Sequence, residues 1–207
     1  MALANIAFAL AQRNGGRRVL AVDLDLEAPG LHRYFRPYLK NANVEDQPGL
    51  MEILSSLREL LTSEGQELER EELVSLVSKA DWDAHTLATD LPSLDFIKAG
   101  RFDASYSERI NTFGWEDLHR KQPNVFAAIA DHLAQRYACV LVDSRTGLTD
   151  ISGICTALLP DTIVAVFAPN RQSINGAVQI LRQAVEYRTS PMICDRCEFF
   201  LWLRVSK

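Results

Sequence analysis

Short apolar runs alternate along the chain with longer segments in which apolar residues recur every three or four positions. A run of four to six apolar residues is typical of a buried strand, whereas the longer recurrence predicts an amphipathic helix. Strands are predicted at 19–24, 94–97, 139–142, 163–167 and 199–203, and helices at about 2–13, 66–79, 124–137 and 173–187. This alternation predicts an α/β fold with a doubly wound, mainly parallel sheet and helices on both faces. The helix at 2–13 is apolar on nearly every side, so we expect it to be buried on several sides.

Two stretches depart from this alternation. Residues 40–90 are acidic and helical, and we interpret them as an insertion on the helical layer or, alternatively, as a lobe that docks a partner. Residues 101–119 are expected to be irregular, with Tyr106, Phe113 and Trp115 as buried cover. The sequence contains no internal repeat or low-complexity tract, so residues 1–207 are predicted to form a single domain.

Two of the predicted strands end in carboxylates. One leads into Asp23 and Asp25 and breaks at Pro29-Gly30, and the other leads into Asp143. The carboxyl ends of parallel strands lie along one edge of a sheet, where a phosphate-bound metal ion or an attacking water can be held. A single aspartate at such a place is commonly a cap. Two such strand ends, about 120 residues apart, favour a nucleotide-hydrolysing site.

The motif that normally completes such a site does not occur in the sequence. A phosphate-binding loop reads G-x-x-x-x-G-K-[ST], and its backbone amides and lysine hold the phosphates. This motif occurs nowhere in the 207 residues, and the segment 2–11 resembles the helix that follows the loop. We therefore expect the domain to be incomplete at its N-terminus, without the first strand and the loop.

These features resemble the ParA/MinD superfamily of deviant Walker A ATPases, and the resemblance covers most of the chain. Asp23 and Asp25 match the D-x-D sequence of the family, and Asp143 matches its Walker B aspartate. Four further segments resemble family elements in the same order: the helix after the loop at 3–12, the glycine-leucine helix at 49–54, the strand ending in Ala99-Gly100, and the strand end Ala168-Pro169-Asn170 that approaches the nucleotide base.

The resemblance implies a nucleotide-dependent switch that hydrolyses ATP with Mg²⁺ when a phosphate loop is present. Asp143 would hold Mg²⁺ through water, and Asp25 would position the attacking water. The remaining residues implied for nucleotide binding are Asp23, Arg145, Pro169 and Asn170. Asp23 would mainly fix the strand end. Arg145 would contact a phosphate or a partner subunit, or would simply be a solvated residue of the switch.

The resemblance also implies a homodimer formed with nucleotide and a protein partner that the sequence does not identify. Without the loop, this chain alone is expected to be inactive. Two other functions stay open: a non-catalytic scaffold or partner-binding domain that has lost nucleotide binding, and an ATPase like the bacterial tyrosine kinases. The kinases have a similar D-x-D strand end, but their tyrosine-rich C-terminal tail is not found in this sequence.

Composition narrows the cellular setting. The chain has 22 Lys+Arg and 27 Asp+Glu, a net charge of -5, so nucleic-acid binding is not indicated. The sequence contains no run of about 18 apolar residues, so no membrane-spanning helix is predicted. Four cysteines without a secretory context predict reduced thiols in the cytoplasm. Cys194 and Cys197 have the spacing of a zinc knuckle, but no second pair completes four ligands.

Overall fold

The computed structural model describes residues 2–13, 15–40, 43–64, 67–144, 158–167, 169–189 and 198–203. The chain falls into two compact units, 1–144 and 145–207, and each is described by itself. The prediction of a single domain over 1–207 stays a prediction. Five residues considered above lie outside the described part of the chain: Arg145, Ala168 and three of the four cysteines, Cys155, Cys194 and Cys197.

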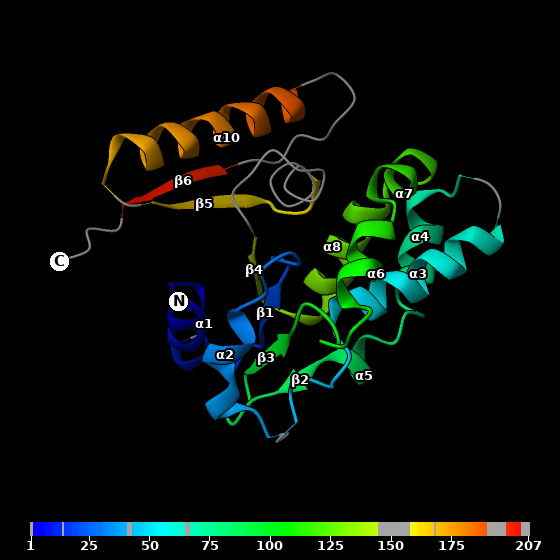
Figure 1. The fold of residues 1–207 in the computed structure, drawn as a ribbon, viewed down its shortest axis with the longest axis horizontal. Helices are drawn as coiled ribbons and strands as arrows, with labels where there is room; N and C mark the ends of the chain where they lie inside the picture. Colours follow the sequence, from blue (N-terminus) through cyan, green and yellow to red (C-terminus); the bar gives the residue numbers. More distant parts are fainter. Residues whose placement is uncertain are drawn as a thin grey trace. The chain divides into compact units, whose positions relative to one another are not determined.

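The first unit is built around a four-stranded sheet in the order β2-β3-β1-β4 (Figure 1). Its strands are β1 (Val19–Asp23), β2 (Leu87–Ala88), β3 (Leu94–Ile97) and β4 (Cys139–Asp143). β1 is parallel to both β3 and β4, whereas β2 pairs antiparallel with β3. Every residue of β1 is buried, because this strand has a neighbour on each edge and helices over both faces.

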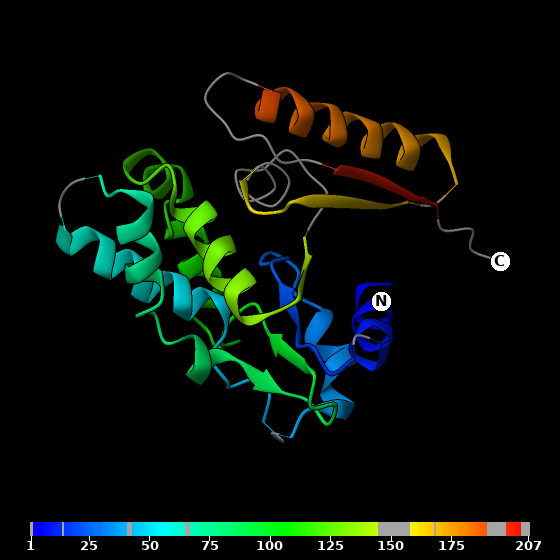
Figure 2. The ribbon, with the colours of Figure 1, turned by 180° about the vertical axis from the view of Figure 1, so that it is seen from behind.

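Helices lie on both faces of this sheet, with α1 and α2 on one side and α3 and α8 on the other (Figures 1 and 2). The helices of the unit are α1 (Ala2–Arg13), α2 (Leu31–Phe35), η1 (Arg36–Tyr38), α3 (Leu50–Glu64), α4 (Arg70–Val77), α5 (Trp82–His85), α6 (Tyr106–Thr112), α7 (Trp115–Lys121) and α8 (Val125–Arg136). This layered arrangement confirms the predicted α/β class.

α1 packs on the sheet through small side chains. Its buried residues are Ala4, Ala7 and Ala11, spaced so that they share one face of the helix. They pack in one core cluster with residues such as Val19 and Phe96. The expectation that α1 is buried on several sides is confirmed in part: its larger apolar residues Leu3, Phe8 and Leu10 pack against the core but are only partly buried.

Residues 101–119 are more regular than expected. α6 and α7 occupy most of this stretch, and Gly114 between them has a φ of +71°, a left-handed conformation that glycine adopts without steric cost. Its aromatic side chains Tyr106, Phe113 and Trp115 are buried. The expectation of an irregular segment was therefore wrong, because a single glycine allows two short helices to follow one another within it.

The second unit contains a strand pair and one long helix. β5 (Thr162–Phe167) runs parallel to β6 (Glu198–Leu203), and α10 (Arg171–Thr189) contacts β5. This strand-helix-strand order is the parallel unit predicted from the sequence. Among the described residues of both units, no helix combines the length and the apolar character needed to cross a membrane.

Candidate functional site

Asp23 and Asp143 end two neighbouring parallel strands. They are paired in register as the last residues of β1 and β4. The chain just beyond Asp23 stays attached to β4, because the Leu24 amide donates to the Asp143 carbonyl at 2.8 Å. Two carboxylates are thereby held at the carboxyl edge of the sheet, where open α/β sheets bind their ligands.

The side chain of Asp23 is fully buried, with an exposed fraction of 0%. Its Oδ2 atom accepts a hydrogen bond from the Leu31 amide at 3.0 Å, whereas its Oδ1 atom has no hydrogen-bond partner among the described residues. Burial raises the pKa of Asp23 to about 7, opposed by the backbone amides of Leu31 and Asp25 and assisted by the charges of Asp143 and Asp25. A buried carboxylate oxygen without a donor is suited to a cation or to a water bound to one.

Asp25 and Asp143 complete the group of carboxylates. Asp25 is partly exposed, and its Oδ1 atom accepts a hydrogen bond from the Ala28 amide at 3.2 Å, which closes the turn after β1. Burial raises the pKa of Asp143, the positive charge of the N-terminal amino group opposes that increase, and the charge of Asp25 adds to it. A cation bound at this edge of the sheet would offset the negative charge of these carboxylates.

The carboxylates fit a magnesium ion shared with phosphate better than one held by protein alone. Within the described residues, no group of three or more His, Cys, Asp or Glu side chains is arranged to hold a metal ion. Mg²⁺ is usually bound through one or two carboxylates, several waters and the phosphates of a substrate. The unpartnered Oδ1 atom of Asp23 and the neighbouring Asp143 fit that mode of binding.

The N-terminal end of α1 is a second feature of the edge of the sheet that carries Asp23 and Asp143. Ser93, which immediately precedes β3, donates from its hydroxyl to the Ala11 carbonyl near the end of α1 at 2.9 Å. The C-terminal end of α1 therefore lies at the amino edge of the sheet, and its N-terminal end points toward the edge that carries Asp23 and Asp143. A helix N-terminus favours phosphate groups through its free amides and dipole.

The other residues predicted for the site, Arg145, Pro169 and Asn170, belong to the second unit. Arg145 lies outside the described residues. Pro169 and Asn170 are both exposed. Asn170 accepts a hydrogen bond from the Ser173 amide at 2.8 Å, so its side chain caps the first turn of α10. Their role at a nucleotide stays a prediction.

Lys98, directly after β3, was not identified from the sequence. Its ammonium is fully buried and donates to three backbone carbonyls, those of Val44, Glu45 and Gln47, at 2.7, 2.7 and 2.8 Å. It also lies 4.3 Å from the centre of the Phe102 ring. Burial lowers the pKa of Lys98 to about 8, so it is still protonated at neutral pH. A lysine at the end of an apolar strand was the available sequence signal.

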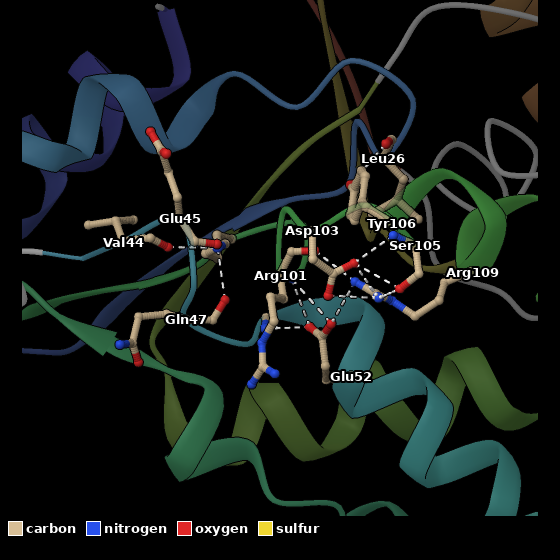
Figure 3. A network of polar contacts seen from close by, with 12 residues as sticks. Leu26, Val44, Glu45, Gln47, Glu52, Arg101, Asp103, Ser105, Tyr106 and Arg109 are labelled. Carbon is tan, nitrogen blue, oxygen red and sulfur yellow. Dashed lines mark hydrogen bonds and ion pairs between the residues drawn. The ribbon is translucent and has the colours of Figure 1, made fainter.

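A second polar group joins the start of α3 to α6 (Figure 3). Glu52 accepts a hydrogen bond from the Gly49 amide at 2.7 Å and forms an ion pair with Arg109 at 3.4 Å. One turn earlier on α6, the Tyr106 hydroxyl donates to the Leu26 carbonyl at 2.9 Å. The segment containing Leu26 also carries Asp25, so this group reaches the carboxylate site. Its residues were also missed, because the sequence gives no sign that α6 approaches that segment.

Comparisons with known proteins agree with this architecture. No protein-family model matches the chain. The chain is 26% identical over 150 residues to a tyrosine-protein kinase of Acinetobacter johnsonii, which covers 72% of this chain but only 15% of the kinase. Because the chain spans such a small part of that relative, the activity of the whole kinase does not transfer directly.

Two solved structures show the fold. The kinase domain of VpsO superposes with a TM-score of 0.58 at 17% identity, over 98% of this chain and 76% of that domain. A ParA family ATPase from Chlorobium tepidum superposes with a TM-score of 0.54 at 23% identity, over 96% of this chain and 66% of that protein. These similarities confirm the fold that the sequence predicts. The chain has the fold of the ParA/MinD superfamily of P-loop ATPases, which it shares with the VpsO kinase domain.

Proposed function

We propose that this chain carries the metal- and water-binding half of a ParA/MinD-like switch that hydrolyses ATP when a phosphate loop is present. The observation that carries the proposal is the in-register pair of Asp23 and Asp143 at neighbouring strand ends, with one buried Asp23 oxygen unpartnered. Phosphoryl transfer in this type of site depends on positioning and charge stabilisation, which such a carboxylate pair can contribute.

Each carboxylate has a distinct proposed role. Mg²⁺, when bound, would neutralise charge that develops on the phosphates. Asp143 would hold the ion through water, at the edge of the sheet toward which the N-terminal end of α1 points. Asp25 would orient the attacking water, because it is partly exposed, unlike Asp23, and lies on the turn after β1. Asp23 would fix that turn through the Leu31 amide.

The proposal includes an assembly and a location. We infer that the nucleotide-bound state is a homodimer that changes its affinity for a protein partner, and that this occurs in the cytoplasm, where ATP and Mg²⁺ are available. The resemblance of the sequence to the ParA/MinD superfamily supports the assembly, and the cysteines without a secretory context support the location. Slow hydrolysis would then determine how long the dimer lasts.

A second candidate function is supported by the matched kinases. The same site could transfer the γ-phosphoryl group to a tyrosine hydroxyl, as the name of the Acinetobacter johnsonii relative suggests; the VpsO domain is likewise named a kinase domain. Both candidates use the same carboxylates, and only the acceptor differs. Incubation with labelled ATP separates them: free phosphate as the main product supports the switch, whereas accumulation of phosphotyrosine supports the kinase.

Calorimetric titration with Mg-ATP tests the proposal. The 207-residue chain should bind no more tightly than about 1 mM, equivalent to about -4 kcal/mol, because its carboxylates repel the polyphosphate and no loop lysine offsets them. A version with a phosphate-loop segment ahead of α1 should bind much more tightly and only with Mg²⁺.

Two aspartate variants of the loop-bearing version give the matched comparison. Asp143→Asn should weaken Mg²⁺-dependent binding. Asp131→Asn should not, although it makes the same charge change, because Asp131 only forms a surface ion pair with Arg70 at 2.6 Å. Equal binding by the two variants would overturn the metal-site assignment. Failure of every loop-bearing version to bind nucleotide would favour the non-catalytic scaffold.

A further inference from the structure

The turn after β1 is attached to a distant part of the chain through one side-chain hydroxyl. Within the segment itself, the Ala28 amide donates to Asp25 and the Leu31 amide donates to Asp23. The Tyr106 hydroxyl then donates to the Leu26 carbonyl at 2.9 Å, across 80 positions of sequence. Leu26 is 1% exposed, so this hydrogen bond is shielded from competing water.

Tyr106 is in turn held from several directions. Its ring packs edge-on against Phe102, with ring centres 5.1 Å apart. A Cβ atom placed on Gly100 would lie 3.2 Å from the Tyr106 ring, which shows how closely the ring sits on the backbone there. Arg109 lies 5.9 Å from the ring centre. The position of the hydroxyl is therefore set by packing that does not involve the turn it holds.

Arg109 fixes α6 against neighbouring segments. Its guanidinium forms ion pairs with Asp103 at 2.8 Å and with Glu52 at 3.4 Å, and donates to the Arg101 carbonyl at 2.7 Å (Figure 3). Glu52 lies in the first turn of α3, so α6 is tied to α3 at this point. The chain of contacts runs without a break from the start of α3 to Leu26.

We propose that Tyr106 is a positioning residue for the carboxylate site: by holding the Leu26 carbonyl, it fixes the turn that carries Asp25. This inference rests on the proposed function for the role of Asp25 in catalysis. The hydrogen bond from the Tyr106 hydroxyl to the Leu26 carbonyl is observed whether or not the proposed function is correct. Burial raises the pKa of Tyr106, and the charges of Asp23, Glu52 and Asp25 add to the increase, so the hydroxyl stays a donor at neutral pH.

Tyr106→Phe tests the attachment directly, because it removes the hydroxyl and keeps the ring. Amide hydrogen exchange in the 207-residue chain needs no catalytic activity. We expect the Ala28 and Leu31 amides to exchange roughly five- to tenfold faster, the factor that corresponds to loss of one hydrogen bond. The Ala128 amide in α8 should not change. Tyr34→Phe, which removes a hydroxyl from an exposed side chain, should leave all three amides unchanged.

Kinetics of the loop-bearing version test the consequence. Tyr106→Phe should lower kcat roughly tenfold through misplacement of Asp25, with the affinity for Mg-ATP unchanged, whereas a general loss of structure would lower both. Unchanged exchange at Ala28 and Leu31 overturns the inference whatever the activity. Faster exchange with an unchanged kcat also overturns it. If the loop-bearing parent does not hydrolyse ATP, the proposed function fails, and the exchange result alone decides whether Tyr106 holds the turn.

Discussion

Substitution of Gly49 by alanine should destabilise the first unit more than substitution of a glycine that has room for a Cβ atom, such as Gly30. An added Cβ atom would lie 2.3 Å from the Lys98 carbonyl oxygen, whereas ordinary contact begins at 3.4 Å. The start of α3 would therefore have to retreat by about 1 Å from the end of β3. At present the Leu50 amide donates to the Lys98 carbonyl at 2.8 Å and the Met51 amide donates to the Ala99 carbonyl at 3.0 Å.

The expected loss follows from these contacts. A retreat of about 1 Å stretches both hydrogen bonds beyond useful range, and each contributes about 1 kcal/mol. Residual strain against the β3 end adds about 1–3 kcal/mol. The predicted decrease in the free energy of unfolding is therefore about 3–5 kcal/mol, a large part of the roughly 5–15 kcal/mol typical of a domain.

Urea denaturation of the parent and two variants measures this decrease. Gly30→Ala is the matched control, because its added Cβ atom would find only the Ala28 carbonyl oxygen, at 3.9 Å, and its φ of -143° suits any residue. We expect the control to change the free energy by less than about 1 kcal/mol. If Gly49→Ala unfolds at the same urea concentration as Gly30→Ala, the reasoning about this close approach is wrong.

Two further predictions concern buried ionisable groups. Lys98→Met leaves three carbonyls without their donor and also removes a buried charge. We expect it to lower the free energy of unfolding by about 3 kcal/mol. A urea midpoint equal to the parent's would contradict this prediction. Burial lowers the pKa values of His32, His119 and His132 below 6.5, so the unfolded state binds more protons. Their contribution to stability is complete above pH 6.5 and is lost as the pH falls through the folded-state values. The raised pKa of Asp23 acts in the opposite direction over the same range, so the test is the difference between two proteins. Lowering the pH from 7.5 to 5 should reduce the melting temperature of His132→Gln less, relative to its own value at pH 7.5, than that of the parent; the same change in both proteins would refute the assignment for His132.

The strands and their carboxylates could be predicted because each depends on local sequence. β1 and β4 are apolar runs that end in Asp23 and Asp143, and parallel pairing then places the two side chains together without further information. The same argument could not reach Lys98, since a charged residue after an apolar strand gives no indication of which carbonyls it will meet.

The contacts around α6 could not be predicted for a different reason. The hydrogen bond from Tyr106 to Leu26 joins positions 80 apart, and its existence depends on where two short helices settle after β3. A sequence pattern reports which residues favour burial, and it correctly indicated that Tyr106 is buried. It does not report which carbonyl a buried hydroxyl will find, because that depends on the tertiary packing.

The most direct test of the account compares Asp25→Asn with its parent in the version that carries a phosphate loop. If Asp25 orients the attacking water, the variant should bind Mg-ATP as tightly as the parent and lose hydrolysis, because only an interaction made in the transition state is removed. Light scattering should then show a nucleotide-bound dimer that persists in the variant and decays in the parent. Hydrolysis of ATP by Asp25→Asn at the parent's rate would contradict the account and leave Asp25 as a cap of the turn after β1.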